Sequence, residues 1–251
     1  MVSTDSPSAF LNDTTYLPPK VPTLYTLLSA PEELVTDPTI YGVNTNPLVV
    51  DHGEVVEIIL NNRDIGKHPF HLHAHNFQVV LRSDVAAGDF DPTSNNVFPT
   101  VPMRRDTIQV PPNGNVVLRF RADNPGVWLF HCHIQWHMQS GLMATIIEAP
   151  RALRAQKGHQ GVQALPPDHL AACQAGGERY EGNAGGSTDD WLDLSNARYP
   201  PDPLPAGFTA RGIVALVLSI LAAFLGMAVI SWYGAAEFET IRKGAAAPST
   251  P

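Results

Sequence analysis

The sequence has only two cysteines, an excess of acidic over basic residues, no internal repeat and no leader-like N-terminus. The formal net charge of −8 argues against a nucleic-acid partner. Residues Met1 to Asp5 contain neither a basic region nor an apolar run, so they do not form a signal peptide. Cys132 and Cys173 need not pair with each other. A length of 251 residues allows one or two domains.

Histidine, by contrast, is concentrated in two short segments. Seven of the ten histidines fall within residues 68–75 and 131–137. In an extended strand, successive side chains point to opposite faces. His131 and His133 therefore share one face, and Cys132 points to the other. His71 and His73 also point the same way, and His68 is expected to lie just before their strand.

A thiolate with two imidazoles is the ligand set of a blue-copper electron-transfer site, and Cys132, His137 and His68 supply it. Four further histidines can hold other copper ions on the opposite side of the strand: His71, His73, His131 and His133. One alternative is scattered core or surface histidines, which two HxH motifs around one cysteine argue against. The other is zinc, but closed structural zinc sites use four ligands and tend to be cysteine-rich. The pattern therefore predicts copper.

These two segments resemble the copper signatures of the multicopper oxidases, in their last cupredoxin domain. The resemblance implies that His68, Cys132 and His137 hold a type 1 copper. It places Leu142 at the axial position as a non-ligating residue, which is expected to raise the reduction potential. It also implies that four histidines form half of the ligands of a trinuclear copper cluster: His71, His73, His131 and His133. Further segments look like fungal iron-uptake ferroxidases: residues 41–42, 61–62, 102–106 and 122–128.

Three positions near the motifs need separate comment. Ala74 replaces the usual glycine, which is expected to tighten the turn. Gln135 stands where related ferroxidases often carry an acid, and this calls a proton relay through that carboxylate into question. His75 ends the first motif but is not a ligand in the family.

Asp64 lies four residues before His68. A carboxylate at this place can bind a hard iron cation close to a copper ligand. In the resembled ferroxidases, an aspartate here belongs to the Fe(II) docking site. The alternative is a loop aspartate that stabilises a turn. Because the motif matches on both sides of Asp64, we favour iron docking.

Short apolar runs broken by Pro, Gly and Asn predict an all-β fold. The expected strands lie within residues 49–50, 55–60, 77–81, 107–110, 116–120, 127–130 and 141–148. This spacing indicates a β-sandwich, and the resemblance makes it a Greek-key, plastocyanin-like cupredoxin. We expect a lead-in over residues 1–15 and a cupredoxin domain over 16–150, corresponding to the third domain of a multicopper oxidase.

The composition changes after Pro150. Residues 151–210, rich in Gly, Pro, Asp and Asn, predict an irregular exposed stalk after a short helical stretch. The uncharged run from Gly212 to Tyr233 is long enough to cross a bilayer, so we expect a transmembrane helix over residues 211–234; a buried core helix is the alternative. Residues 235–251 then form a cytosolic tail. The copper domain is expected outside the plasma membrane, where the single glycosylation sequon at Asn12 also fits.

The function implied is that of the C-terminal part of a membrane-anchored ferroxidase, which oxidises Fe(II), reduces O2 to water and works with an iron permease. A trinuclear site in this family needs two further HxH pairs, which the other four histidines do not form: His52, His75, His159 and His169. We therefore expect upstream domains that this chain lacks, as in a fragment or truncated gene model, and Cys173 either pairs there or is a free thiol. The alternatives are a laccase-like phenol oxidase, and a single-cupredoxin electron carrier or inactive copper-binding remnant.

Overall fold

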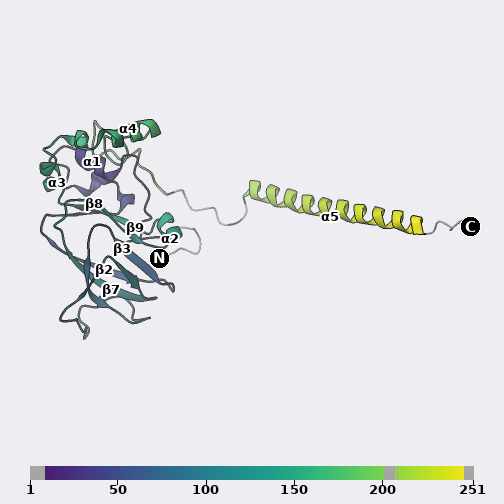
Figure 1. Ribbon diagram of the computed structural model, residues 1–251, viewed down its shortest axis with the longest axis horizontal. Coiled ribbons are helices and arrows are strands. Elements are labelled where there is room, and N and C mark those ends of the chain that lie inside the picture. The colour runs from purple at the N-terminus through teal and green to yellow at the C-terminus, as the bar shows by residue number, and fades with distance from the viewer. Residues whose placement is uncertain (1–8, 201–206, 208, 246–251) are drawn as a thin grey trace, which may run out of the picture. The chain divides into compact units, whose positions relative to one another are not determined.

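The computed structural model describes residues 9–200, 207 and 209–245. The chain divides into two compact units, residues 1–201 and 202–251. The first unit is a β-sandwich with short helices beside it, and the second contains one long helix (Figure 1). Residues 1–8 of the predicted lead-in and residues 246–251 of the predicted tail lie outside the described residues.

The described part of the first unit contains nine strands in two sheets, as expected for an all-β domain. The five-stranded sheet has, in spatial order, β1 (Pro47–Val50), β9 (Met143–Glu148), β8 (Gly126–Cys132), β3 (His68–Leu72) and β6 (Thr107–Val110). The four-stranded sheet has β2 (Val55–Asn62), β7 (Gly114–Arg121), β4 (Phe77–Arg82) and β5 (Met103–Arg105). β1 runs parallel to β9, whereas the other pairs are antiparallel. All the predicted strands are present, and β5 was not predicted.

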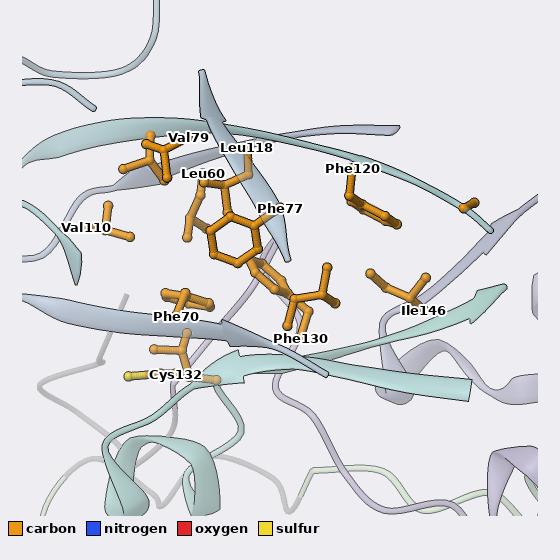
Figure 2. Close-up of a cluster of buried hydrophobic side chains, with 14 of the residues drawn as sticks. Leu60, Phe70, Phe77, Val79, Val110, Leu118, Phe120, Phe130, Cys132 and Ile146 are labelled. Atoms are coloured by element: carbon orange, nitrogen blue, oxygen red, sulfur yellow. The ribbon is translucent and has the colours of Figure 1, made fainter. Parts of the chain in front are cut away.

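Large apolar side chains from both sheets fill the space between them (Figure 2). The ring centroids of Phe70 and Phe130 lie 5.1 Å apart beneath the two central strands. Burying a side chain of this size stabilises the fold by about 1.5–3 kcal/mol. Cys132 lies at the margin of this cluster in Figure 2, with its sulfur directed away from the phenylalanine rings. β3 and β8 therefore rest on a packed core that fixes where their polar residues point.

His68 is the first residue of β3 and pairs with Val110 of β6, so it lies within the strand and not before it. The alternation along β3 then buries His68, Phe70 and Leu72 and leaves His71 partly exposed. Because side chains alternate along a strand, His68 and His71, three residues apart, point to opposite faces of the sheet. This register explains why the first histidine motif serves both faces of the sheet.

Residues 16–46, the first part of the predicted cupredoxin domain, are helical or irregular. They contain α1 (Thr23–Ser29) and the 3-10 helices η1 (Pro38–Tyr41) and η2 (Val43–Thr45). α1 contributes Tyr25, Leu27 and Leu28 to a second buried cluster, which also includes Ile147 of β9. The five-stranded sheet is consequently covered on both faces along β9. The alternating pattern of the strand indicated only the buried inner face, so the covering by α1 was not predicted.

Residues up to 200 belong to the folded unit, in contrast to the exposed stalk predicted over 151–210. They include α3 (Pro150–Gln156), η3 (Gly161–Ala164) and α4 (Pro167–Gly176). Leu153 and Val162 join the second cluster. Asn183 is fully buried, accepts the N–H groups of Gly185 and Ser187, and donates to carbonyls of residues 190, 191 and 193. The packing of Leu153 and Val162 attaches the segment to the domain, and the local hydrogen bonds of Asn183 order a loop whose composition resembles a linker.

The second unit contains α5 (Ala210–Ala245). Its first 26 residues, Ala210–Ala235, are long and apolar enough to cross a membrane. None of their side chains is buried within the chain. The bounds of this apolar part agree with the span expected at residues 211–234, and α5 itself continues ten residues further, to Ala245.

Candidate metal centre

Three predicted ligands converge between β3, β8 and the short helix α2 (Gln135–Gln139). The Nδ1 atoms of His68 and His137 are 3.2 Å apart, and Sγ of Cys132 lies 3.7 and 3.5 Å from them. The exposed fractions of the three residues are 3%, 6% and 0%. α2 produces this geometry because it turns His137 back toward the strand end. A single ion can therefore contact all three atoms.

The electrostatics of this group suit a soft cation. Burial raises the pKa of the Cys132 thiol, and burial together with the neighbouring His68 lowers the pKa of His137. Without a cation the thiol keeps its proton, whereas a metal ion deprotonates a coordinating thiol outright. One thiolate with two neutral imidazoles is the donor set that copper prefers in blue sites. The residues present therefore fit copper.

Leu142 follows α2 and is also buried at this place. Its carbonyl accepts the N–H of Cys132 at 3.0 Å, and its N–H donates to the carbonyl of His137 at 3.1 Å. The Leu142 side chain belongs to the apolar cluster between the sheets. It offers hydrocarbon beside the ligands and no donor atom.

The other four histidines gather beyond the same strand ends. Nε2 of His73 is 3.0 Å from Nε2 of His131. The His71 ring lies 5.0 Å from that of His73 and 5.8 Å from that of His133, centroid to centroid. Burial and the neighbouring imidazoles lower the pKa values of His73 and His131. These rings therefore tend to be neutral and able to bind metal.

Hydrogen bonds select the ring nitrogen that each histidine presents. Nδ1 of His71 is 2.8 Å from the carbonyl of Asp106, and Nδ1 of His131 is 3.0 Å from the carbonyl of Cys132. A carbonyl can only accept, so Nδ1 carries the proton and Nε2 keeps a lone pair for a metal. At His68 the order is reversed, because Nε2 faces Asp64 and Nδ1 faces Cys132.

Asp64 contacts the outer nitrogen of a ligand, which the sequence alone did not show. Its Oδ2 lies 2.9 Å from Nε2 of His68. Partial burial acts to raise the pKa of Asp64, but hydrogen bonds from His68, Gly66 and Ile65 outweigh it and hold the pKa below its usual range. Asn62 shapes the loop by accepting the Asp64 N–H at 3.0 Å. The carboxylate is ionised, and its side chain is 23% exposed.

Two further residues of the motifs take different places. Gln135 is the exposed first residue of α2. His75 is buried, and its Nε2 lies 3.0 Å from Oε2 of Glu148, whose side chain is fully buried. Burial raises the pKa of Glu148, and the Asn124 N–H and His75 oppose this shift. Sequence reasoning missed Glu148, since a lone glutamate at the end of an apolar strand carries no motif.

The fold and the ligands together define a class of protein. A family model of the multicopper oxidases matches residues 16–152, and the chain belongs to this family of oxidoreductases. The prediction of an all-β cupredoxin domain is thereby confirmed.

Within the family, the chain is similar to proteins of fungal iron transport. It is 55% identical to the iron transport multicopper oxidase fetC of Epichloe festucae, over 91% of this chain and 36% of that protein. It is 45% identical to the iron transport multicopper oxidase FET3 of Saccharomyces cerevisiae, over 92% of this chain and 37% of that protein. The crystal structure of Fet3p, a multicopper oxidase that functions in iron import, superposes with a TM-score of 0.69 at 44% identity, covering 74% of this chain and 36% of that one. The chain thus spans little more than a third of these relatives' length.

Proposed function

We propose that this chain works within a membrane-anchored ferroxidase that oxidises Fe(II) to Fe(III), reduces O2 to water and serves iron uptake. The observation that carries the proposal is the 2.9 Å contact between the Asp64 carboxylate and His68. Similarity to iron transport multicopper oxidases supports iron as the substrate. The exposed edge of Asp64 offers a hard, ionised oxygen ligand to Fe(II).

Copper bound to this chain would supply a one-electron acceptor at the three-ligand group and O2 reduction at a trinuclear cluster. His68, Cys132 and His137 would hold the type 1 ion, with Leu142 as its non-ligating axial neighbour. Four histidines would provide half of the cluster ligands: His71, His73, His131 and His133. The peptide chain itself joins the two groups, since Cys132 is bonded directly to His131 and His133.

The proposed protein also needs further copper ligands, a membrane anchor and a transport partner. Four histidines are half of a trinuclear ligand set, so upstream domains would supply the other half. α5 would cross the plasma membrane once, with the copper domain outside, the C-terminus in the cytosol and an iron permease beside it. Alkaline carbonate washing tests the anchor: the full chain should stay with membranes, and a chain ending at Pro205 should be released.

Iron docking is tested by single-turnover reduction of the copper-loaded chain. Asp64→Asn keeps an acceptor near His68 but removes the charge, so bleaching of the blue absorption by Fe(II) should slow at least about tenfold, the equivalent of 1.4 kcal/mol. Bleaching by an outer-sphere reductant such as hexacyanoferrate(II) should change little. Asp91→Asn, in an exposed loop, is the matched control. Equal slowing with both reductants would show that Asp64 acts on His68 and not on iron.

A single-domain electron carrier is the second candidate, because the three-ligand group is complete within this chain. The two functions differ in oxygen chemistry. With Fe(II) as donor, this chain alone should stall after reduction of its blue site, and a protein with the upstream domains restored should consume O2 continuously. Failure of the longer protein to turn over would favour the carrier.

A further inference from the structure

A buried contact between a histidine and a glutamate lies behind the turn that follows β3. His75 and Glu148 approach to 3.0 Å, with side-chain exposures of 6% and 0%. The ring of His75 lies beside two aromatic rings, with Phe120 at 4.8 Å and Trp128 at 6.5 Å between centroids. Burying two ionisable groups is costly unless each is partnered. Neither residue belongs to the ligand groups described above, so the pair needs another explanation.

The pair and its neighbours hold the two carbonyl groups of the turn. Nδ1 of His75 is 3.1 Å from the carbonyl of His73, and it carries the proton because that carbonyl can only accept. Its Nε2 lies 3.0 Å from Oε2 of Glu148, within ion-pair distance but outside hydrogen-bond geometry. The second carboxylate oxygen of Glu148 accepts the N–H of Asn124 at 2.7 Å, and the Asn124 amide donates to the carbonyl of Ala74 at 3.4 Å.

The turn needs such support because its backbone is strained. Ala74 has a φ of 60°, in the left-handed region that costs a non-glycine residue free energy. His73 lies one residue past the end of β3, beyond its regular pairing. Its N–H donates to the carbonyl of Leu129 at 3.0 Å, so the bond from His75 fixes the remaining backbone polar group of His73.

We infer that His75 and Glu148 are positioning residues that hold His73 against His131, so that both Nε2 atoms face one metal-binding space. The inference rests on the proposed function, in which these histidines bind copper. Groups that orient metal ligands from behind typically change metal affinity 10–100-fold when they are removed. The pair acts through the backbone of His73 and not through its imidazole.

The test compares copper binding at the two ligand groups in the full chain. Cu(II) is titrated while the blue absorption reports the three-ligand group and the non-blue electron paramagnetic resonance signal reports the four histidines. The double variant His75→Phe with Glu148→Gln keeps an aromatic ring beside Phe120 and leaves no unpaired buried carboxylate. It should weaken non-blue binding about 10–100-fold and leave the blue absorption unchanged.

Two further variants separate positioning from folding. As a single substitution, His75→Asn retains a donor near the His73 carbonyl. It should keep most of the non-blue Cu(II) affinity that the double variant loses. His52→Phe, at an exposed histidine, is the control and should change neither signal. Wild-type affinity in the double variant would overturn the inference while leaving the proposed cluster intact. Absence of non-blue binding in the wild-type chain would overturn the inference, whereas the proposed function is decided by O2 consumption with the upstream domains restored. A double variant that also loses the blue absorption is damaged at both ligand groups. The single variant His75→Asn then decides the matter. If it keeps the blue absorption but has weak non-blue binding, the inference is wrong.

Discussion

The two proposed groups of copper ligands lie along β3 and at the end of β8 but differ in completeness. The three-ligand group is buried, and its donor atoms all lie within 4.8 Å of one another. The four histidines range from the buried His131 to the exposed His133, and they face away from the core. All donor atoms of the three-ligand group come from this chain, whereas the four histidines form an open surface.

This difference shows how a domain divides its metal chemistry. The buried group has its dielectric and geometry set by the local core, so its spectrum and potential should be properties of this chain. The open group is oriented by the carbonyls of Asp106 and Cys132 and by the His75–Glu148 pair, and in the proposed function it receives further donors from other domains. Variants that affect one group and spare the other can test this division.

Replacing Cys132 with serine should have the largest effect. Cys132→Ser removes the thiolate, and the intense visible absorption of the copper-loaded chain should vanish, because that absorption arises from thiolate-to-Cu(II) charge transfer. Non-blue copper binding at the four histidines should persist. Cys173→Ser, which alters only a thiol hydrogen-bonded to Tyr25 at 3.2 Å, should leave the absorption intact. A blue Cys132→Ser protein would refute the ligand assignment.

Removing the shared support should weaken both groups together. Phe70 pairs in register with Cys132 and is 3% exposed. Phe70→Ala leaves a cavity under β3 and β8, and the free energy of unfolding should fall by about 3–5 kcal/mol. Urea denaturation measures this loss. Phe98→Ala, at a half-exposed position, should change the free energy of unfolding by less than about 0.5 kcal/mol; equal losses would mean that the core does not support the sites.

An axial substitution should tune the buried group alone. Leu142→Met places a thioether next to the three ligands, and an axial sulfur should lower the reduction potential of the blue copper. Redox titration followed by the visible absorption measures the shift. The affinity of the four histidines for Cu(II) should not change. A raised potential would argue against the axial placement of Leu142.

Relieving the strain at Ala74 should have the smallest effect, and only beside the open group. Ala74→Gly removes the penalty of a φ of 60°, although glycine gains entropy in the unfolded chain. The free energy of unfolding should rise by about 0.5–1 kcal/mol. The blue absorption should stay the same. A destabilised variant would show that the turn gains more from the Ala74 methyl group than it loses in strain.

The sequence was informative wherever a local period determined the structure. Alternation along the strands placed Cys132 opposite His131 and His133 and gave the strand positions, and the structure reproduces both. It could not supply contacts that depend on the conformation of a loop or on which distant strands pair. Glu148 meets His75 only because β9 pairs with β8, and Asp64 reaches His68 only because a loop held by Asn62 turns back.

The prediction of an exposed stalk after Pro150 was wrong for the same reason. Its Gly- and Asp-rich composition is typical of a linker, but Asn183 is buried through bonds to a loop that no periodic pattern announces. Likewise, α1 packs on the outer face of β9. The alternating sequence of β9 accounts for its buried inner face and gives no sign that the outer face is also covered. Composition reports average solvent exposure, whereas a few specific hydrogen bonds decide whether a segment folds onto a domain.

The pairing of β3 with β8 has a consequence for how the chain folds in the cell. His71 lies opposite His131, and Phe70 opposite Cys132. A slip of one residue would turn every side chain of β3 to the other face, which would separate His68 from Cys132 and His71 from His131 at once. Only the native alignment therefore captures copper, and a ligand that binds the native state alone stabilises it by about 2.7 kcal/mol at 100 times its Kd. Metal loading would thus act as a proofreading step, retaining chains whose strands have paired correctly.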